Sequence, residues 1–259
     1  MDLGIAGRKA IVCASSRGLG KACAQALAEA GCDVVINGRD AKRLDAVAAE
    51  LAKLTHAKIT AVAADVATAD GQQVLLAACP APDILINNNA GPPARDFREL
   101  TRAQMIDGVI ANMIVAVELI QKVIGPMSER KFGRIVNITS GSVKMPLAGL
   151  DLSSGARAGL TAFLAGVART VADKNVTINN VLPGAFDTDR LRGMLSKTAE
   201  QKGVSVEEAA KARKATIPAR RFGEPAEFGA ACAFLCSAQA GYITGQNLLI
   251  DGGTFNSAF

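Results

Sequence analysis

The stretch "AIVCASSRGLGKACAQALAEAG", residues 10–31, decides the fold. A short apolar run gives way to small residues and then to Gly18 and Gly20, and an Ala-rich segment with helical periodicity follows. Glycines at such a turn let the backbone come close to a pyrophosphate, and the start of the next helix supplies N–H donors and a positive dipole end. Because the two glycines stand between the first strand and the first helix, the stretch predicts the opening unit of a dinucleotide-binding sheet.

The second predicted strand ends in "VVINGRD", residues 34–40. A chain that binds NAD usually has a carboxylate here, which accepts a hydrogen bond from the ribose 2′-hydroxyl. This chain has Asn37, followed two residues later by Arg39. A guanidinium can bind a 2′-phosphate through two hydrogen bonds, and no carboxylate at position 37 repels that phosphate. Arg17 in the glycine loop is a second cation within reach. The sequence therefore predicts NADP(H) in preference to NAD(H).

Short β-branched runs alternate with longer helical patterns along the rest of the chain. Strands are predicted at 9–15, 33–38, 58–65, 83–88, 134–140, 176–182 and 247–251, and helices at 18–30, 41–54, 69–78, 101–130 (one long helix or two), 153–174 and 225–237. Repeated strand–helix alternation implies right-handed crossovers and a parallel sheet. We therefore expect a single α/β domain over 1–259, a Rossmann-type doubly wound parallel sheet of about seven strands with helices on both faces.

One segment interrupts this alternation. Residues 187–222 are polar, helical in pattern and rich in Lys and Arg. Ligands of open α/β sheets lie beyond the carboxyl ends of the strands, and an insertion that leaves a strand end can fold over that crevice. We interpret 187–222 as a helical lid; the alternative is a surface helix without a role in binding.

Composition limits the classes of function. The chain has 259 residues, of which 49% are hydrophobic and 4% aromatic, and a net charge of +5. A core of Ala, Val, Ile and Leu suits a parallel sheet buried on both faces. Lys and Arg are dispersed without a basic stripe, which favours an ordinary solvated surface and argues against nucleic-acid binding.

Six cysteines are present without a C-x-x-C pair, and His56 is the single histidine. This set does not suit zinc, so we expect no metal site and buried free thiols in a reducing compartment. The N-terminal residues lack the long apolar run of a signal peptide, and we expect no stretch of about 18 apolar residues that would span a membrane. The prediction is a cytoplasmic protein without a membrane partner.

Several motifs in order make the chain similar to the short-chain dehydrogenase/reductase family over nearly its full length. They are "CASSRGLG" at 13–20, where small residues replace the first Thr and Gly of the family pattern, "DV" at 65–66, "NNAG" at 88–91, Asn112, "IVNITS" at 135–140, "PGAFDT" at 183–188, "RFGEPAE" at 221–227, "YITGQ" at 242–246 and "DGG" at 251–253.

This resemblance implies the residues of the site. Ser140 would bind the substrate carbonyl, and Asn112 would support the active site. Together with the glycine loop and the second strand, the resemblance implies cofactor contacts at Ala14, Ser16, Arg17, Gly18, Leu19, Gly20, Asn37, Arg39, Asp65, Val66, Asn89, Ala90, Gly91, Arg157, Pro183, Gly184 and Thr188.

The active-site helix departs from the family pattern. In the family, a Tyr thirteen residues after the Ser protonates the substrate oxygen, and a Lys four residues later holds the ribose and lowers the pKa of the phenol. These positions carry Ser153 and Arg157 here, although the surrounding "SSGARAGLTAF" keeps the family register. A serine hydroxyl is shorter and less acidic than a phenol, and a guanidinium keeps the charge but does not relay protons. The single tyrosine, Tyr242, belongs to the late "GYITGQ" segment and is expected to be structural.

Other groups are candidates for delivering the proton. A water held by Ser153 is one, and Asp151, Lys144 and Ser142 are others, although each of these three also suits an ordinary loop position. General acid–base catalysis contributes about 10²–10⁴-fold to a rate, so its loss slows hydride transfer without abolishing it.

Three functions follow from these observations. The first is an NADP(H)-dependent oxidoreductase that interconverts a small-molecule carbonyl and its alcohol, with a resemblance to 3-oxoacyl-carrier-protein reductases. The second is an NADP-binding protein without activity, a sensor or a silent oligomer partner, and the third is a non-redox enzyme on the same scaffold. From the resemblance and the apolar segment 228–253 we expect a homotetramer.

Overall fold

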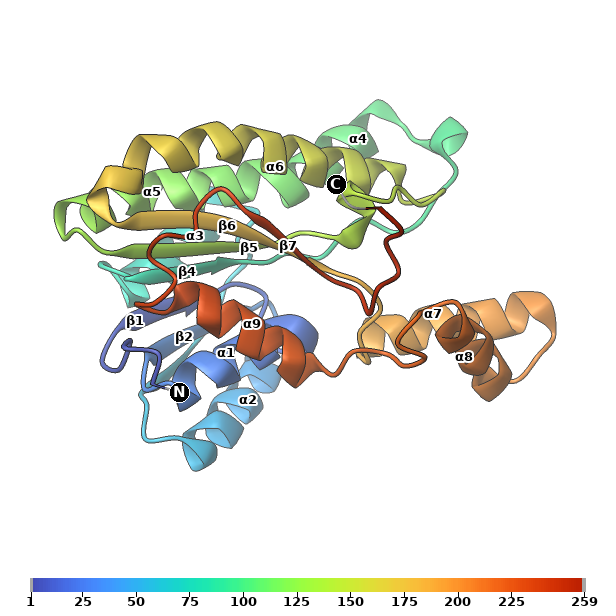
Figure 1. Ribbon diagram of the computed structural model, residues 1–259, viewed down its shortest axis with the longest axis horizontal. Helices are drawn as coiled ribbons and strands as arrows, with labels where there is room; N and C mark the ends of the chain where they lie inside the picture. Colours follow the sequence, from blue (N-terminus) through green and yellow to red (C-terminus); the bar gives the residue numbers. More distant parts are fainter. Residues whose placement is uncertain (1, 258–259) are drawn as a thin grey trace.

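The computed structural model describes residues 2–257, which form a single parallel sheet with helices on both faces (Figure 1). The strand order is β3-β2-β1-β4-β5-β6-β7. The strands are β1 (Lys9–Val12), β2 (Asp33–Gly38), β3 (Ile59–Ala63), β4 (Ile84–Asn87), β5 (Gly133–Ile138), β6 (Val176–Pro183) and β7 (Asn247–Ile250). All neighbouring strands pair in parallel. The predicted seven-stranded, doubly wound α/β fold is confirmed.

The helices fall where the sequence pattern expects them, with two additional helices in the predicted lid segment. They are α1 (Gly18–Glu29), α2 (Ala41–Leu54), α3 (Ala69–Ala78), α4 (Arg102–Val109), α5 (Val115–Glu129), α6 (Asp151–Val171), α7 (Asp189–Lys202), α8 (Val206–Ala215) and α9 (Pro225–Cys236). Short 3-10 turns occur at η1 (Phe97–Glu99), η3 (Gly141–Val143) and η4 (Ala172–Lys174).

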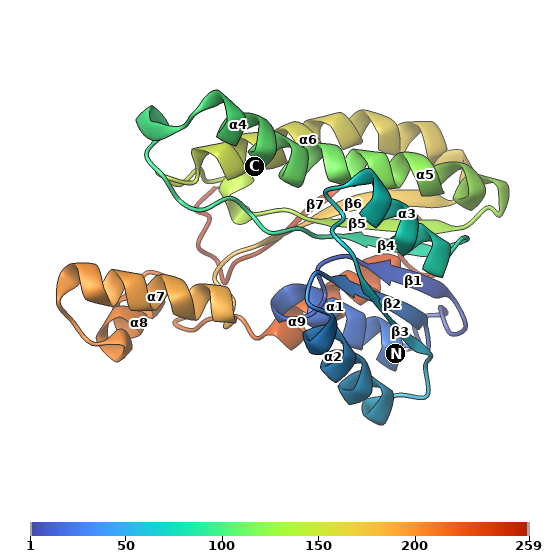
Figure 2. The ribbon, with the colours of Figure 1, turned by 180° about the vertical axis from the view of Figure 1, so that it is seen from behind.

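The two faces of the sheet carry separate cores. Helices α1, α2 and α9 cover one face, and α3, α5 and α6 cover the other (Figures 1 and 2). Successive strand residues point to opposite faces, so Val12 packs in the first core while Ile11 packs in the second. Both faces are buried, which explains why the strands are continuous apolar runs.

The segment predicted as helical over 101–130 is one continuous helical run, in which a π-helical turn separates two α-helical parts. The π-helical turn η2 (Ile110–Ile114) joins α4 to α5 and contains the buried Asn112. Such turns insert one extra residue into the helix and are frequent at functional sites. The apolar periodicity of the segment does not distinguish a π turn from ordinary helix.

The sequence has no uninterrupted stretch of about 18 apolar residues, but one helical run is long and apolar enough to cross a membrane by length and composition alone. The helical run Arg102–Glu129 passes that test by length and composition, with a mean hydropathy of 1.6 over its best window. Glu118 and Lys122 lie within this run, so its apolar residues do not form one continuous stretch although their mean hydropathy is high. In the fold, α5 packs its Leu119, Ile120 and Val123 into the core beside the sheet.

All six cysteines are buried and free, as the sequence predicts. Within residues 2–257, no group of three or more His, Cys, Asp and Glu side chains has the arrangement of a metal site.

The segment between β6 and α9 forms an arm that projects from the body of the molecule (Figures 1 and 2). Helices α7 and α8 pack against each other, and Leu195, Ile217 and Phe222 form a small core separate from those of the sheet. The two helices lie within the predicted lid boundaries, 187–222. Whether the arm closes over the sheet stays a prediction.

Candidate functional site

The candidate site lies at the carboxyl ends of the central strands. Strand β1 pairs with β2 on one side and β4 on the other, so the chain turns in opposite directions from this point. This reversal makes a crevice beyond the strand ends, the usual ligand site of open α/β sheets. The loops after β1, β4, β5 and β6 carry most of the residues that the sequence analysis selects.

Close backbone contact explains the glycine loop. A Cβ at Gly20 would lie 2.4 Å from the carbonyl oxygen of Ala14 and 2.9 Å from Nδ2 of Asn88, so no side chain fits there. The same Asn88 Nδ2 donates to the carbonyl oxygen of Ala14 at 3.1 Å. Ala14 has a φ of 44°, the left-handed conformation that favours glycine, at the position where the family pattern has Gly.

Buried polar side chains fix this loop from below. Ser15 Oγ accepts a hydrogen bond from the amide of Asn37 at 2.9 Å and donates to the carbonyl of Val12 at 2.7 Å. Asn37 is buried; its Nδ2 donates to the carbonyls of Val62 and Ala64, and its Oδ1 accepts from the amide of Ala14. The side chain of Asn37 therefore joins neighbouring loops and strands, and it leaves Arg39 as the outward-facing group at this strand end.

The positive groups around this loop have few partners. Arg17 precedes α1 and makes no side-chain cap, so the first N–H groups of the helix are not satisfied by a side chain there. The side chain of Arg39 is 75% exposed, and its ion pair with Asp65 is long, 3.9 Å between Nη1 and Oδ2. Val66 is buried behind Asp65. The arrangement can accept anionic groups both at the start of α1 and at the end of β2.

Two more predicted positions, Ser16 and Leu19, belong to the glycine loop. A Cβ at Gly38 would lie 3.2 Å from Oγ of Ser16, so the small residue lets this loop approach β2. Leu19 is partly buried against the core beneath α1.

Ser140 lies two residues beyond the end of β5 and has an unshared hydroxyl proton. Its Oγ accepts hydrogen bonds from the amide of Ser142 at 3.1 Å and from the hydroxyl of Ser142 at 2.9 Å. No acceptor for the Ser140 hydroxyl is found among residues 2–257, and the residue is half-buried. Ser140 can therefore donate to an oxygen atom that arrives from the crevice.

Arg157 is buried and ties two strand ends together. Its Nη1 donates to the carbonyls of Ile138 at 2.7 Å and Thr139 at 3.0 Å, and its Nη2 donates to the carbonyl of Asn89 at 3.4 Å. Its Nε donates to Oγ of Ser153, which is also buried, at 3.3 Å. Helix α6 thus brings Ser153 and Arg157 together, one turn apart, beneath the end of β5.

Asn112 lies in the π turn, close to the loop after β4. Its Nδ2 donates to the carbonyl of Gly108 at 3.2 Å, while its buried Oδ1 has no partner among the described residues. Asn89 Nδ2 donates to the carbonyl of Ala111 at 3.2 Å, and Asn89 Oδ1 accepts from the amide of Ala90. The π turn therefore positions the loop that carries Asn89, Ala90 and Gly91.

The loop after β6 completes the crevice. Gly184 follows Pro183 and lies so close to β7 that a Cβ would meet Cα of Asp251 at 2.6 Å. Thr188 caps α7, with its Oγ1 accepting from the amide of Leu191. A Cβ at Gly18 would lie 3.6 Å from the Thr188 side chain, so this loop leans against the start of α1.

The alternative proton donors lie in different surroundings. Asp151 is exposed and accepts a hydrogen bond from the amide of Gly149 at 3.1 Å, and Lys144 lies 5.4 Å from the ring centroid of Phe255. Tyr242 is fully exposed in the loop between α9 and β7.

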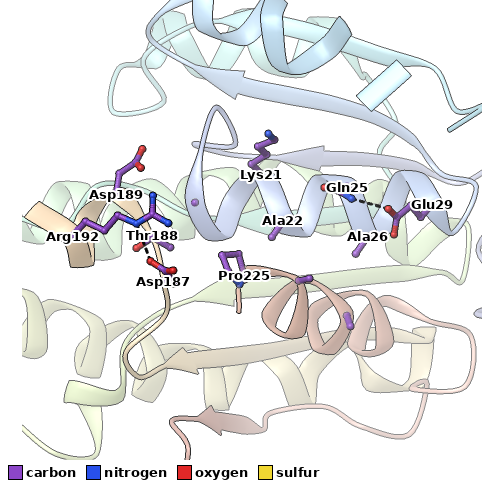
Figure 3. Close-up of a pocket in the computed structure, with 13 residues that line it drawn as sticks. Lys21, Ala22, Gln25, Ala26, Glu29, Asp187, Thr188, Asp189, Arg192 and Pro225 are labelled. Atoms are coloured by element: carbon purple, nitrogen blue, oxygen red, sulfur yellow. Dashed lines mark hydrogen bonds and ion pairs between the residues drawn. The ribbon is translucent and has the colours of Figure 1, made fainter. Parts of the chain in front are cut away.

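A surface groove of about 500 Å³ runs between α1, α9 and the start of α7 (Figure 3). It shares Gly18 and Thr188 with the predicted site, but most of its lining residues belong to α1 and α9. Asp187 and Arg192 form an ion pair of 2.9 Å at its end (Figure 3).

Sequence reasoning missed Arg190, the second residue of α7. A Cβ at Gly91 would lie 3.1 Å from both Nη atoms of Arg190, so the guanidinium rests against the backbone of the loop after β4. Burial lowers the pKa of Arg157 to about 10, and the positive charge of Arg190 contributes further in the same direction. No local pattern predicts this contact, because it joins the arm to a distant loop.

Comparison with known proteins agrees with this geometry. The family model described as enoyl-(acyl carrier protein) reductase matches residues 13–254. The NADPH-dependent reductase BacG of Bacillus subtilis is 30% identical over 255 residues, which covers 96% of this chain and 98% of the relative. The 3-oxoacyl-[acyl-carrier-protein] reductase FabG of Aquifex aeolicus is 31% identical over 259 residues, 98% of this chain and 100% of the relative.

Solved structures of reductases have the same fold as this chain. The L-sorbose reductase of Gluconobacter frateurii, solved with NADPH and L-sorbose, superposes with a TM-score of 0.94 at 26% identity and covers 99% of this chain and 100% of that one. Fold and site together define an oxidoreductase built on a dinucleotide-binding sheet. The chain belongs to the short-chain dehydrogenase/reductase family, as its motifs predict.

Proposed function

We propose that this chain is an NADP(H)-dependent oxidoreductase that interconverts a carbonyl and an alcohol, with Ser140 as the group that polarises the carbonyl. The observation that carries the proposal is the hydroxyl of Ser140, which accepts two hydrogen bonds from Ser142 and keeps its own proton for an incoming oxygen. The NADPH-dependent reductases among the relatives support the choice of reaction.

The residues fit an NADP cofactor. The absence of a side chain at Gly20 lets the first loop pack closely against the start of α1, and α1 begins without a side-chain cap, which suits a pyrophosphate. Arg39, exposed and held only by a long ion pair to Asp65, suits the 2′-phosphate, with Arg17 nearby. The loops with Asn89, Ala90 and Gly91 and with Pro183, Gly184 and Thr188 would hold the nicotinamide end.

The cofactor, when bound, supplies a hydride to the carbonyl carbon. Ser140 donates a hydrogen bond to the carbonyl oxygen and stabilises the negative charge that develops there. Ser142 donates its hydroxyl proton to Oγ of Ser140, which orients the Ser140 proton toward the crevice. Asn112 supports the floor of the site through the π turn.

We infer that Ser153 and Arg157 stand where the family has its Tyr and Lys. Ser153 Oγ accepts a hydrogen bond from Arg157 Nε, so its hydroxyl proton can orient a water molecule. Arg157, with a pKa of about 10, stays charged at neutral pH and adds positive potential near the alkoxide. In this proposal solvent water delivers the final proton.

The first substrates to test are 3-oxoacyl compounds, since one of the relatives is named for that activity. The test is a titration with NADPH and NADH, followed by NADPH consumption with a panel of activated ketones and 3-oxoacyl thioesters. Ser140→Ala should lower kcat by about 10²–10³, the usual loss for one oxyanion donor. Ser128→Ala, a hydroxyl on α5 that bonds the carbonyl of Ile124, is the matched control and should leave turnover unchanged.

Two results would contradict the proposal. If the protein binds NADPH tightly but oxidises it with none of the ketones, it is an NADP-binding protein without redox activity. Turnover that Ser140→Ala does not reduce would remove Ser140 from the reaction.

A further inference from the structure

We propose that Arg190 binds an anionic group of the substrate, so that the preferred substrates are carbonyl compounds that carry a carboxylate. This inference rests on the proposed function, because it names the substrate class of the same site.

The position of Arg190 is the first argument. Its guanidinium approaches Gly91 with its Nη atoms, which both lie 3.1 Å from the place of a Cβ, whereas Cζ lies 3.5 Å from it. A side chain at position 91 would push the guanidinium back. Arg190 is otherwise exposed, and within residues 2–257 its side chain has no ion pair and no hydrogen bond. Its hydrogen-bond donors are therefore free for a ligand.

A second guanidinium holds the same loop from the inside. Arg157 donates to the carbonyl of Asn89, two residues before Gly91, and to the carbonyl of Thr139, which directly precedes Ser140. The charge of Arg190 lowers the pKa of Arg157, so the two positive charges repel each other across this loop. Neither forms an ion pair with a carboxylate of the described chain. An anion at the mouth of the site would relieve that repulsion.

The loop that Arg190 contacts lies next to the strand that precedes Ser140. The proposed 2′-phosphate and pyrophosphate contacts lie at the ends of β2 and β1, whereas Gly91 follows β4 and Ser140 follows β5. Arg157 joins the Asn89–Gly91 loop to Thr139, so the loop that Arg190 contacts extends from the cofactor toward Ser140. A guanidinium binds a carboxylate through two parallel hydrogen bonds, which would also orient the substrate.

The neighbouring arginine on α7 provides a matched control. Arg192 lies two residues away and pairs with Asp187 on the groove beside α1 (Figure 3). Arg190→Met and Arg192→Met remove the same charge from the same helix, but only the first removes it from the loop of Gly91.

The experiment compares acetoacetate with its neutral methyl ester. In the unaltered protein we expect a preference for the acid in kcat/KM. In Arg190→Met this preference should fall by about 10- to 100-fold, the range for loss of a charged hydrogen-bonded contact, whereas Arg192→Met should keep it. Calorimetric titration with NADPH should give the same Kd for the protein and for Arg190→Met.

Binding without turnover separates this inference from the proposed function. Acetoacetate should bind to the protein loaded with NADP⁺, which cannot reduce it, and Arg190→Met should weaken that binding by a similar factor. That result would support the anion site even if no ketone is reduced. Equal use of acid and ester by the unaltered protein would overturn the inference while the oxidoreductase function stands. A loss of NADPH affinity in Arg190→Met, with equal losses for acid and ester, would assign the arginine to the cofactor phosphates and would also overturn it.

Discussion

Arg157 uses most of its hydrogen-bonding capacity within the protein. A guanidinium has five N–H donors. Arg157 directs them to Ile138, Thr139, Asn89 and Ser153, which leaves about one donor for the ribose hydroxyls. The ribose contact that the family resemblance implies would therefore be weaker than that of a lysine, and the side chain also fixes the end of β5. Neither effect can be predicted from the sequence, which shows only that a positively charged arginine replaces the positively charged lysine of the family pattern.

The first prediction restores the family pair. If proton delivery limits the reaction, Ser153→Tyr with Arg157→Lys should raise turnover of an activated ketone above that of the unaltered protein, with little change in NADPH affinity. The expected gain is up to the 10²–10⁴-fold that general acid–base catalysis supplies. Ser153→Tyr alone should gain less, because the guanidinium is bulkier and more diffuse than an ammonium. Steady-state NADPH consumption measures the effect.

The contrary outcome is informative as well. If the double variant gains nothing while the unaltered protein turns over its own substrate readily, another group delivers the proton. The rate losses of Asp151→Asn, Lys144→Met and Ser140→Ala then identify that group.

The second prediction concerns cofactor choice. Arg39→Ala should weaken NADPH binding by about 1–3 kcal/mol and leave NADH binding unchanged, since only NADPH has a phosphate for the guanidinium. Calorimetric titration with both cofactors measures it. Arg43→Ala, a neighbouring arginine that lies 4.0 Å from Asp40, is the control. Equal affinity of the unaltered protein for NADPH and NADH would contradict the prediction.

At the scale of elements, the sequence predicts the strands and helices well. The strands are short continuous apolar runs, whereas the helices repeat their apolar residues at helical spacing. Strand ends are less certain: the first strand is predicted to 15 but ends at Val12, because Ala14 turns into the left-handed conformation. The loop positions follow once the strand order is known, since parallel strands bring their carboxyl ends to one edge. The contact of Arg190 with Gly91 could not be predicted, since the direction of the arm depends on packing between distant segments.

The third prediction tests the arm as a lid. The small core of Leu195, Ile217 and Phe222 keeps α7 and α8 together as a unit, so the arm can move as one body on its two connecting segments. NADPH with acetoacetate should slow hydrogen exchange over 189–215, measured by mass spectrometry, and should leave the buried helix α9 unchanged. Exchange in the arm that does not respond to ligands would contradict the lid.

At the scale of the whole molecule, Arg134 joins the sheet to the last helix. It is buried, and its guanidinium donates to the carbonyls of Ser237 and Asn175 and to Oδ1 of Asn175. It also lies over the ring of Phe132, 4.4 Å from the centroid. Burial lowers the pKa of Arg134, but the surrounding carbonyl oxygens provide partners for its charge.

The fourth prediction follows from these contacts. Arg134→Met should lower the free energy of unfolding by about 2–4 kcal/mol, because it leaves buried carbonyl groups without donors. Urea unfolding followed by circular dichroism measures the loss. Arg98→Met removes an exposed arginine paired with Asp96 and should leave the urea midpoint unchanged. Equal midpoints for all three proteins would show that Arg134 adds no net stability.

The last prediction concerns assembly. The strand β7 is an edge of the sheet, and the segment 228–253 exposes Phe234, Tyr242 and Leu248 around it. A second set of exposed apolar side chains, Met105 and Ile106 among them, lies on α4. Two separate apolar faces on one chain suit two different two-fold contacts, and two such contacts make a tetramer.

Light scattering at micromolar concentration should therefore give the mass of four chains. Leu248→Lys places a charge on the edge strand and should reduce the mass to that of two chains, because the contact at α4 remains. Leu54→Lys, at an exposed position on α2, should leave the tetramer intact. A monomeric mass for the unaltered protein would contradict the assembly, whereas a dimer that Leu248→Lys does not change would place its contact away from β7.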